Sequence, residues 1–185
     1  MAGKGCHHPF RGSNTWLLEE NGWTGIAIDA NPLGHLFEGK RSRTRFFQAL
    51  LWSAEGEELS FSSMEGSAFD GVEHTLGLHK GAHAKGGAAL QTMKTRTLAS
   101  VLDEAGAPEE LDFVSLDVEG AELEVLAAFP FERYRMRVLS VEHNHEEPKR
   151  GDIAKLLQSH GYVLAAEVFF AASFIPRCML FCCRT

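Results

Sequence analysis

The sequence has few of the residues that would place it in several common protein classes. Four cysteines among 185 residues are too few for a disulfide scaffold, and their spacing matches no common zinc-binding pattern. We therefore expect reduced thiols and a cytoplasmic location. The first twelve residues lack the apolar core of a signal peptide, and no run of about 18 uninterrupted apolar residues follows, so we expect no membrane partner.

Positive charge is also scarce. Lys and Arg total 18 against 25 Asp and Glu, which gives a formal net charge of −7. Unspecific binding to nucleic acid rests on clustered excess positive charge, so this balance excludes that class of partner. With 44% hydrophobic and 23% charged residues the composition is typical of a folded protein, and the length allows one domain.

Helix and strand signals alternate along the chain, which indicates an α/β fold built around a mostly parallel sheet. The two C-terminal runs, 162–170 and 174–183, are expected to pair as antiparallel strands. The other strands are predicted over residues 24–29, 46–51, 59–63, 111–118 and 137–142, and helices over 16–18, 98–105, 121–128 and 152–160. Residues 59–63 read as a small edge strand because apolar and polar residues alternate there.

One segment lacks any periodic pattern. Residues 65–93 are rich in Gly, His and Ala, which predicts a flexible loop inside a single domain that extends over residues 13–185. Residues 1–12 are predicted to be an atypical N-terminal segment. The histidines of the loop have no fixed geometry in the sequence and do not indicate a metal site.

Acidic residues end three of the predicted strands. Asp29 ends the first, Asp117 and Glu119 end the fourth, and Glu142 ends the fifth. Because ligands of open α/β sheets bind outside the carboxyl ends of the strands, these residues are expected to line one crevice. Such a cluster serves either as oxygen ligands for a hard cation or as the base for a substrate hydroxyl, and the sequence leaves both open.

Individual polar residues have competing interpretations. Asp29 has the reach to accept hydrogen bonds from the two hydroxyls of a ribose, or it caps the turn at Asn31-Pro32. For Glu122 and Glu124, a solvated helix face is favoured over a role in the crevice. The basic residues around Arg41 likewise read as a solvated rim before the next strand.

Several blocks together resemble the FkbM-type methyltransferase family. They are Ser13-Asn14-Thr15, Asp29, Asn31-Pro32, the run SLDVEGAELEVL over residues 115–126, Glu142 and Asn144. Their order and spacing agree with the family over residues 13–162. The resemblance implies the Rossmann-like fold of methyltransferases that use S-adenosylmethionine, and an activity toward hydroxyl groups, often on sugars or other secondary metabolites.

The resemblance also implies roles for single residues. Asp29 matches the acidic residue that holds the cofactor ribose, and Asp117 and Glu119 match the acidic pair beside the transferred methyl group. We therefore predict as cofactor-binding residues Asn14, Asp29, Asn31 and Asp117, and as catalytic residues Asp117, Glu119 and Glu142. No metal ligand is assigned, although a divalent cation at the crevice stays open.

The front of the chain departs from the family pattern. Family members begin with an apolar strand that enters a Gly-rich turn, where backbone amides approach the cofactor. Here only twelve residues precede Ser13, and Pro9 stands where the second glycine of the turn is expected. Four residues before Gly5 are too few for a central strand. The expected fold is therefore a Rossmann-like methyltransferase fold that is N-terminally incomplete.

Three functions follow from these observations. The first is an S-adenosylmethionine-dependent O-methyltransferase acting on a hydroxyl of a small molecule or glycan. The second is a truncated, catalytically inactive methyltransferase fold that serves as an interaction module. The third, a nucleotide-sugar enzyme using another cofactor, is least favoured because the sequence lacks the pattern G-x-G-x-x-G. A homo-oligomer is left open.

Overall fold

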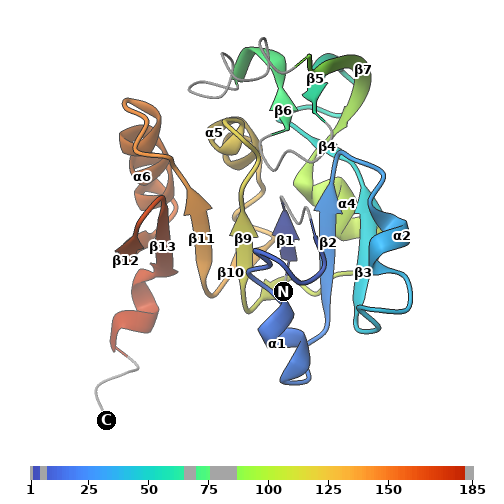
Figure 1. The fold of residues 1–185 in the computed structure, drawn as a ribbon. Helices are drawn as coiled ribbons and strands as arrows, with labels where there is room; N and C mark the ends of the chain where they lie inside the picture. Colours follow the sequence, from blue (N-terminus) through green and yellow to red (C-terminus); the bar gives the residue numbers. More distant parts are fainter. Residues whose placement is uncertain (1, 5–7, 65–69, 76–86, 182–185) are drawn as a thin grey trace.

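The computed structural model describes residues 2–4, 8–64, 70–75 and 87–181. Its largest element is a seven-stranded sheet with the order β12-β13-β11-β9-β1-β2-β3 (Figure 1). The strands are β1 (Ala2–Lys4), β2 (Gly25–Asp29), β3 (Thr44–Gln48), β9 (Val114–Leu116), β11 (Leu139–Glu142), β12 (Tyr162–Val168) and β13 (Ala171–Pro176).

Five neighbouring strands of this sheet, from β3 to β11, are parallel. The chain leaves β1 toward β2 and β3, then crosses to the other side of β1 to form β9 and β11. The direction of winding therefore reverses between β1 and β9. In open α/β sheets the crevice at such a reversal, outside the carboxyl ends of the strands, is where ligands bind.

The expectation that the fold lacks its central strand is wrong for the sheet itself. Ala2–Lys4 pairs in parallel with β2 on one side and with β9 on the other, with Ala2 opposite both Ile26 and Val114. A strand of only three residues can form here because it makes backbone hydrogen bonds with a neighbouring strand on each side. Gly5, the expected glycine of the turn, lies outside the described residues.

The predicted C-terminal strand pair is confirmed. β12 and β13 pair antiparallel from Tyr162 opposite Pro176 to Val168 opposite Ala171, with an irregularity between Leu164 and Ala166. β13 also runs antiparallel to β11. The sheet is therefore mixed, and β12 forms one of its two edges.

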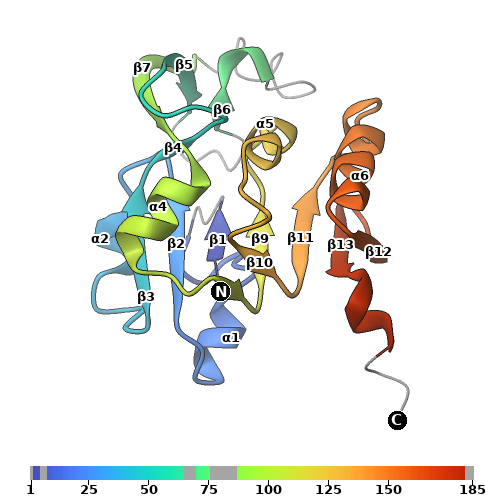
Figure 2. The same ribbon diagram turned by 180° about the vertical axis from the view of Figure 1, so that it is seen from behind.

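A second sheet lies beyond the carboxyl ends of the central strands (Figures 1 and 2). It has the order β4-β7-β5-β6 and contains β4 (Leu50–Leu51), β5 (Glu58–Ser63), β6 (Gly71–Val72) and β7 (Ala89–Arg96), with the short 3-10 helix η1 (Glu73–Thr75) after β6. The structure differs from the sequence prediction in two ways. The strand predicted at the sheet edge, β5, is internal, and parts of the expected loop 65–93 form β6 and the start of β7. Residues 65–69 and 76–86 of that loop lie outside the described residues.

The helices connect the strands at positions close to those predicted. They are α1 (Trp16–Glu20), α2 (Gly34–Phe37), α4 (Leu98–Ala105), α5 (Glu122–Ala127), α6 (Lys149–Ser159) and the 3-10 helix η3 (Arg177–Phe181), and a two-stranded parallel ladder joins β8 (Glu110–Leu111) to β10 (Arg135–Met136). In α4 the Thr97 side chain caps the first turn by accepting from the Ser100 amide at 3.1 Å, and Gly106 ends the helix in a left-handed conformation. None of the described helices is long and apolar enough to cross a membrane.

The hydrophobic core lies between the sheet and these helices. Val101 and Leu102 of α4 and Leu126 of α5 have no measurable solvent exposure, and Leu139 of β11 and Leu157 of α6 are equally buried. Both faces of the parallel part of the sheet are covered. This explains why the parallel strands are short apolar runs in the sequence.

The ion pair between Arg41 and Glu19 is buried. Arg41 and Glu19 are 3% and 7% exposed, and Arg41 Nε donates to Glu19 Oε2 at 2.5 Å. The guanidinium donates further hydrogen bonds to the Pro9 carbonyl and to the hydroxyls of Ser13, Thr15 and Thr44. Arg41 is therefore not a solvated rim residue, as its sequence context suggested, but ties the segment that precedes α1 to β3.

The environment of Glu19 keeps its carboxylate charged. Burial alone would raise the pKa of Glu19, but hydrogen bonds from Thr44, Arg41 and the Arg43 amide, together with the charge of Arg41, outweigh it and lower the pKa below its usual value. Removing either partner leaves a buried charge without compensation, which is the costly way to break such a pair.

We expect Arg41→Met to lower the free energy of unfolding by about 3–5 kcal/mol, because it isolates the buried Glu19 carboxylate. Urea denaturation followed by circular dichroism measures this change. The double variant Arg41→Met with Glu19→Leu should lose less than the sum of the two single variants, since it removes both charges. Strictly additive losses would contradict this account of the pair.

Candidate active site

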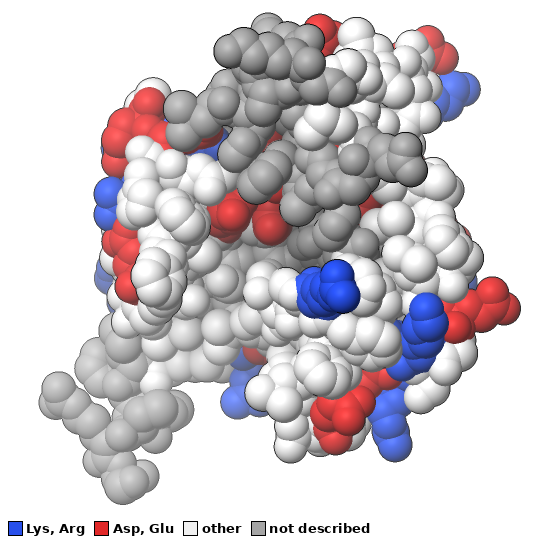
Figure 3. Space-filling view, viewed as in Figure 1, with Lys and Arg blue, Asp and Glu red and all other residues white. Residues whose placement is uncertain are grey.

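Three of the predicted site residues converge at the carboxyl ends of β9 and β11. In the register of these strands Val141 lies opposite Leu116, so Glu142 and Asp117 follow as neighbours. Carboxylate oxygens of Asp117, Glu119 and Glu142 lie within 4.8 Å of one another. Figure 3 shows acidic side chains gathered in a hollow of this face. The sequence prediction that acidic strand ends meet in one crevice is confirmed for these three.

The loop from β9 to α5 is held by a fourth carboxylate. Glu122 is 1% exposed, and its Oε1 accepts from the amides of Val118 at 2.8 Å and Gly120 at 3.3 Å. Its other oxygen lies 3.3 Å from Lys149 Nζ. The interpretation of Glu122 as part of a solvated helix face is therefore wrong, because the first turn of α5 points its carboxylate back into the loop.

Gly120 permits a close approach of the second sheet to this loop. Its φ is +104°, and a Cβ at this position would lie 2.0 Å from the Thr75 carbonyl oxygen. The preceding residue, Glu119, also has a positive φ, of +52°. The loop is therefore pinned between η1 on one side and Glu122 on the other, which fixes the direction of the Glu119 side chain.

Crowding of the carboxylates changes the chemistry of Glu142. Burial, followed by the charge of Asp117 and a hydrogen bond with it, raises the pKa of Glu142 from its usual value of 4.5 to about 8. Glu119 and Glu122 contribute in the same direction. The side chain of Asn144 donates to Glu142 Oε2 at 3.1 Å and orients it. At neutral pH the pair of Asp117 and Glu142 therefore retains a proton.

Asp117 has one oxygen poised for an external group. Its Oδ1 is buried and has no hydrogen-bond partner within the described ranges. An unmatched carboxylate oxygen is costly in a buried position unless something binds it. A ligand that brings a hydrogen-bond donor or a positive charge would remove that cost.

The other predicted site residues lie on either side of β1, near the carboxyl ends of the strands. Asn14 donates from Nδ2 to the Ser115 hydroxyl of β9 at 2.9 Å. Asp29, buried at the end of β2, accepts from the Asn31 amide at 2.9 Å, so it does cap the turn as one interpretation proposed. Asn31 in turn donates to Asp70, a residue that sequence reasoning missed because it lies in the aperiodic segment.

A second cluster near the crevice is not suited to a metal ion. Ligand atoms of His143, His145 and Glu167 lie within 4.8 Å of one another. However, His143 Nδ1 accepts from the His145 amide at 3.0 Å, so in the neutral ring Nε2 carries the proton, and it faces Glu167 at 3.2 Å. Burial lowers the pKa of His143, which agrees with a neutral ring. The same carboxylate also binds Arg150 at 2.6 Å.

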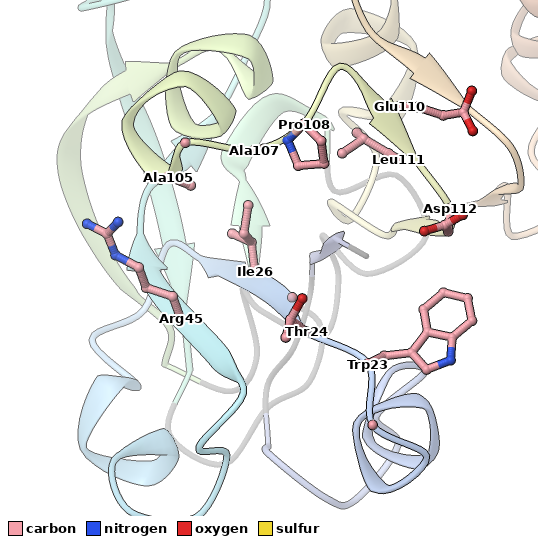
Figure 4. Close-up of a pocket in the computed structure, with 13 residues that line it drawn as sticks. Trp23, Thr24, Ile26, Arg45, Ala105, Ala107, Pro108, Glu110, Leu111 and Asp112 are labelled. Carbon is pink, nitrogen blue, oxygen red and sulfur yellow. The ribbon is translucent and has the colours of Figure 1, made fainter.

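The structure has another pocket at the opposite ends of the strands. This pocket of about 490 Å³ opens at the start of β2 and after α4 (Figure 4). Its carboxylates, Glu110 and Asp112, are exposed and share one arginine, Arg137, at 3.9 and 3.1 Å, so they do not form a buried converging group. We therefore place the candidate active site at the carboxyl edge, where the carboxylates converge.

Comparison with known families shows the family to which the chain belongs. The methyltransferase FkbM domain matches residues 10–164, which is most of the chain. The chain belongs to the FkbM methyltransferase family. No curated protein and no solved structure matches the sequence.

The matched range of the FkbM domain contains all the residues assigned to the site by resemblance. Their individual roles stay predictions. Sequence reasoning missed Glu122, Lys149 and Thr75 as parts of the site's support. Among these three, only Glu122 could have been found from the sequence. It lies in the first turn of a helix, four residues after Val118, and a carboxylate at such a position can accept hydrogen bonds from the unpaired amides at the start of the helix.

We expect Gly120→Ala to lower the free energy of unfolding by about 3 kcal/mol or more, since a methyl group would both clash with the Thr75 backbone and strain the positive φ. Gly106→Ala is the matched control, because Gly106 also has a positive φ but has open space around its Cβ position. That control should cost only about 1–2 kcal/mol. Equal losses in chemical denaturation would contradict the close approach.

Glu142 should make the protein less stable as pH rises. Folding raises the pKa of Glu142. As the pH rises from about 4.5 to 8, the unfolded chain therefore loses the Glu142 proton while the folded protein keeps it, and the free energy of unfolding falls. Folding lowers the pKa of His143, so at and below its ordinary pKa of 6.5 this residue makes the protein more stable as pH rises. The effect of Glu142 is therefore measured as the difference between a variant and the wild type.

We expect Glu142→Gln, which cannot ionise, to melt at a higher temperature than wild type at pH 9 and to lose most of this advantage at pH 5. Differential scanning calorimetry from pH 5 to 9 measures the difference. A difference in melting temperature that does not change with pH would show that Glu142 titrates normally.

Proposed function

We propose that this FkbM-family protein transfers a methyl group from S-adenosylmethionine to a hydroxyl of a small molecule or glycan. The observation that carries the proposal is the converging carboxylate group of Asp117, Glu119 and Glu142 at the point where the winding of the sheet reverses. Family membership supplies the reaction type, and this edge of the sheet supplies a place for it.

The residues at the crevice suit this cofactor. Asp29 ends β2 with a buried carboxylate, which can accept hydrogen bonds from ribose hydroxyls while it caps the turn at Asn31. On the other side of β1, the buried Oδ1 of Asp117 suits a positively charged or hydrogen-bond-donating group. Asn14 lies next to β9 and completes the set of polar side chains on this edge.

When bound, S-adenosylmethionine supplies an electrophilic methyl group on a sulfonium. Transfer of that methyl group to an acceptor oxygen would form an oxygen–carbon bond and break the carbon–sulfur bond, with the electron pair leaving on sulfur. The task of this chain is to align the hydroxyl and to accept its proton. Because Glu142 already holds a proton at neutral pH, Asp117 is the member of the pair that takes the proton of the hydroxyl, and Glu119 supports the pair through its charge.

The properties of the pair suit it to this task. A carboxyl whose pKa is raised to about 8 exchanges its proton near neutral pH, where a normal glutamate would be fully ionised. The same three carboxylates also form an oxygen-rich group of the kind that a divalent cation prefers. We assign no metal ligand.

The alternative of an inactive interaction module loses the observation that motivated it. It rested on the apparent absence of the central strand, and Ala2–Lys4 occupies that position between β2 and β9.

Isothermal titration with S-adenosylmethionine tests the proposal. We expect saturable binding by the wild type and binding at least tenfold weaker in Asp29→Asn, because hydrogen bonds to a charged group are worth about 1.5–3 kcal/mol. Asp112→Asn, the same change at the opposite edge of the sheet, should bind like wild type. No detectable heat from the wild type at millimolar ligand would reject the proposed function.

A further inference from the structure

Exposed apolar side chains are concentrated in one short segment. Four of the eight large hydrophobic residues that are exposed within the described ranges fall between residues 164 and 170. They are Leu164, Val168, Phe169 and Phe170, and Phe169 is 82% exposed. Single exposed apolar residues are ordinary, but a contiguous group of this kind marks an interaction surface.

The segment lies at an open edge of the main sheet. β12 is the last strand in the sheet order and pairs only with β13 among the described strands. Edge strands are normally protected from pairing by outward charges or prolines. The sequence of β12 is YVLAAEV, and its one charged side chain, Glu167, turns to Arg150 at 2.6 Å and to His143 at 3.2 Å. The edge therefore has no protecting charge.

Contacts within the chain hold Phe170 in place at the tip of the hairpin, next to Phe169. The Phe170 carbonyl accepts from the amides of His143 at 2.7 Å and Asn144 at 3.3 Å, and its ring lies 5.6 Å from that of His145. Phe169 has a φ of +51°, a region in which a bulky side chain is strained. Glycine or asparagine would be unstrained in such a turn, so an exposed phenylalanine here has no benefit within its own chain.

A pocket that could receive such a side chain lies beside the strand. It has a volume of about 350 Å³ and lies between α6 and the sheet. Its walls are mostly apolar and include Val141, Ile153, Ala154, Leu164 and Phe174, while His143, Glu147, Arg150 and Glu167 also line it. An apolar cavity of about 150 Å³ is large enough for benzene, so this pocket has room for a phenylalanine ring.

We propose that this surface binds a second copy of the chain, with the open edges of β12 side by side and Phe169 of each copy in the pocket of the other. The protruding ring and the pocket belong to one surface, because the pocket wall includes Leu164 and Glu167 and the ring follows two residues later. A surface that carries both halves of a contact is self-complementary, which is the requirement for a two-fold symmetric dimer.

The area available is consistent with a stable dimer. At about 200 Å² for a fully exposed ring, Phe169 and Phe170 together offer roughly 280 Å² of apolar surface. This is about a third of the roughly 800 Å² that each partner buries in a standard interface, so the proposed dimer also has to bury the β12 edge and the pocket rim. Aromatic side chains seated in pockets are also the residues that dominate interface energies. The proposal does not depend on the methyl-transfer reaction.

Sedimentation velocity of the full chain between about 1 and 100 μM tests the proposal. We expect the wild type to dimerise, and Phe169→Asp and Leu164→Glu each to raise the dimer dissociation constant at least tenfold. Leu17→Asp is the matched control, because Leu17 is 69% exposed on α1 and should dimerise like wild type. Circular dichroism establishes that each variant is folded.

A mixing experiment distinguishes this contact from general hydrophobic association. Phe169→Asp lacks the ring but has an intact pocket, and Leu164→Glu lacks the pocket wall but has an intact ring. Their mixture can therefore form heterodimers with one intact contact, so we expect dimers that neither variant forms alone. A wild type that stays monomeric at 100 μM, or a Leu17→Asp variant that loses dimers equally, overturns the proposal. Flotation of such a monomer with phosphatidylcholine vesicles would assign the tip to lipid instead.

Discussion

The carboxyl groups of Asp117, Glu119 and Glu142 repel one another, and the surrounding structure depends on holding them together. Their oxygens lie within 4.8 Å in a partly buried crevice, where water screens charge poorly. Two features reduce the cost. Glu142 keeps a proton at neutral pH, and Lys149 lies 3.3 Å from Glu122 and brings a positive charge to the rear of the cluster.

The scaffold explains why the repulsion does not open the site. β9 and β11 are hydrogen-bonded neighbours, so Asp117 and Glu142 cannot separate without breaking the sheet. Glu119 is held by the loop that Glu122 anchors through the amides of Val118 and Gly120. The free energy that maintains the cluster therefore comes from backbone pairing and from the core beneath it. A group that binds Asp117 Oδ1 would recover part of that cost.

The sequence was sufficient to predict which strand ends carry the acidic residues, because short apolar runs that stop at a carboxylate are a local pattern. It was not sufficient to predict burial that depends on partners distant in the chain. Arg41 reads as a rim residue until Glu19 is placed beside it, and Glu122 reads as a helix surface until the loop before it turns back. β1 was missed for the same reason, because three residues form a strand only when two neighbours supply its hydrogen bonds.

Backbone strain connects the candidate site to the β12–β13 hairpin. In the described part of the chain, the non-glycine residues with a positive φ are Glu119, Asn144, His145 and Phe169. All four follow or join the carboxyl ends of β9, β11 and β12, and strained residues of this kind persist only where surrounding contacts determine them. The Phe170 carbonyl binds the amides of the turn that follows Glu142. Any contact that restrains the hairpin tip therefore also restrains the turn that follows Glu142. The exposed apolar surface and the candidate active site thus belong to one rigid part of the fold.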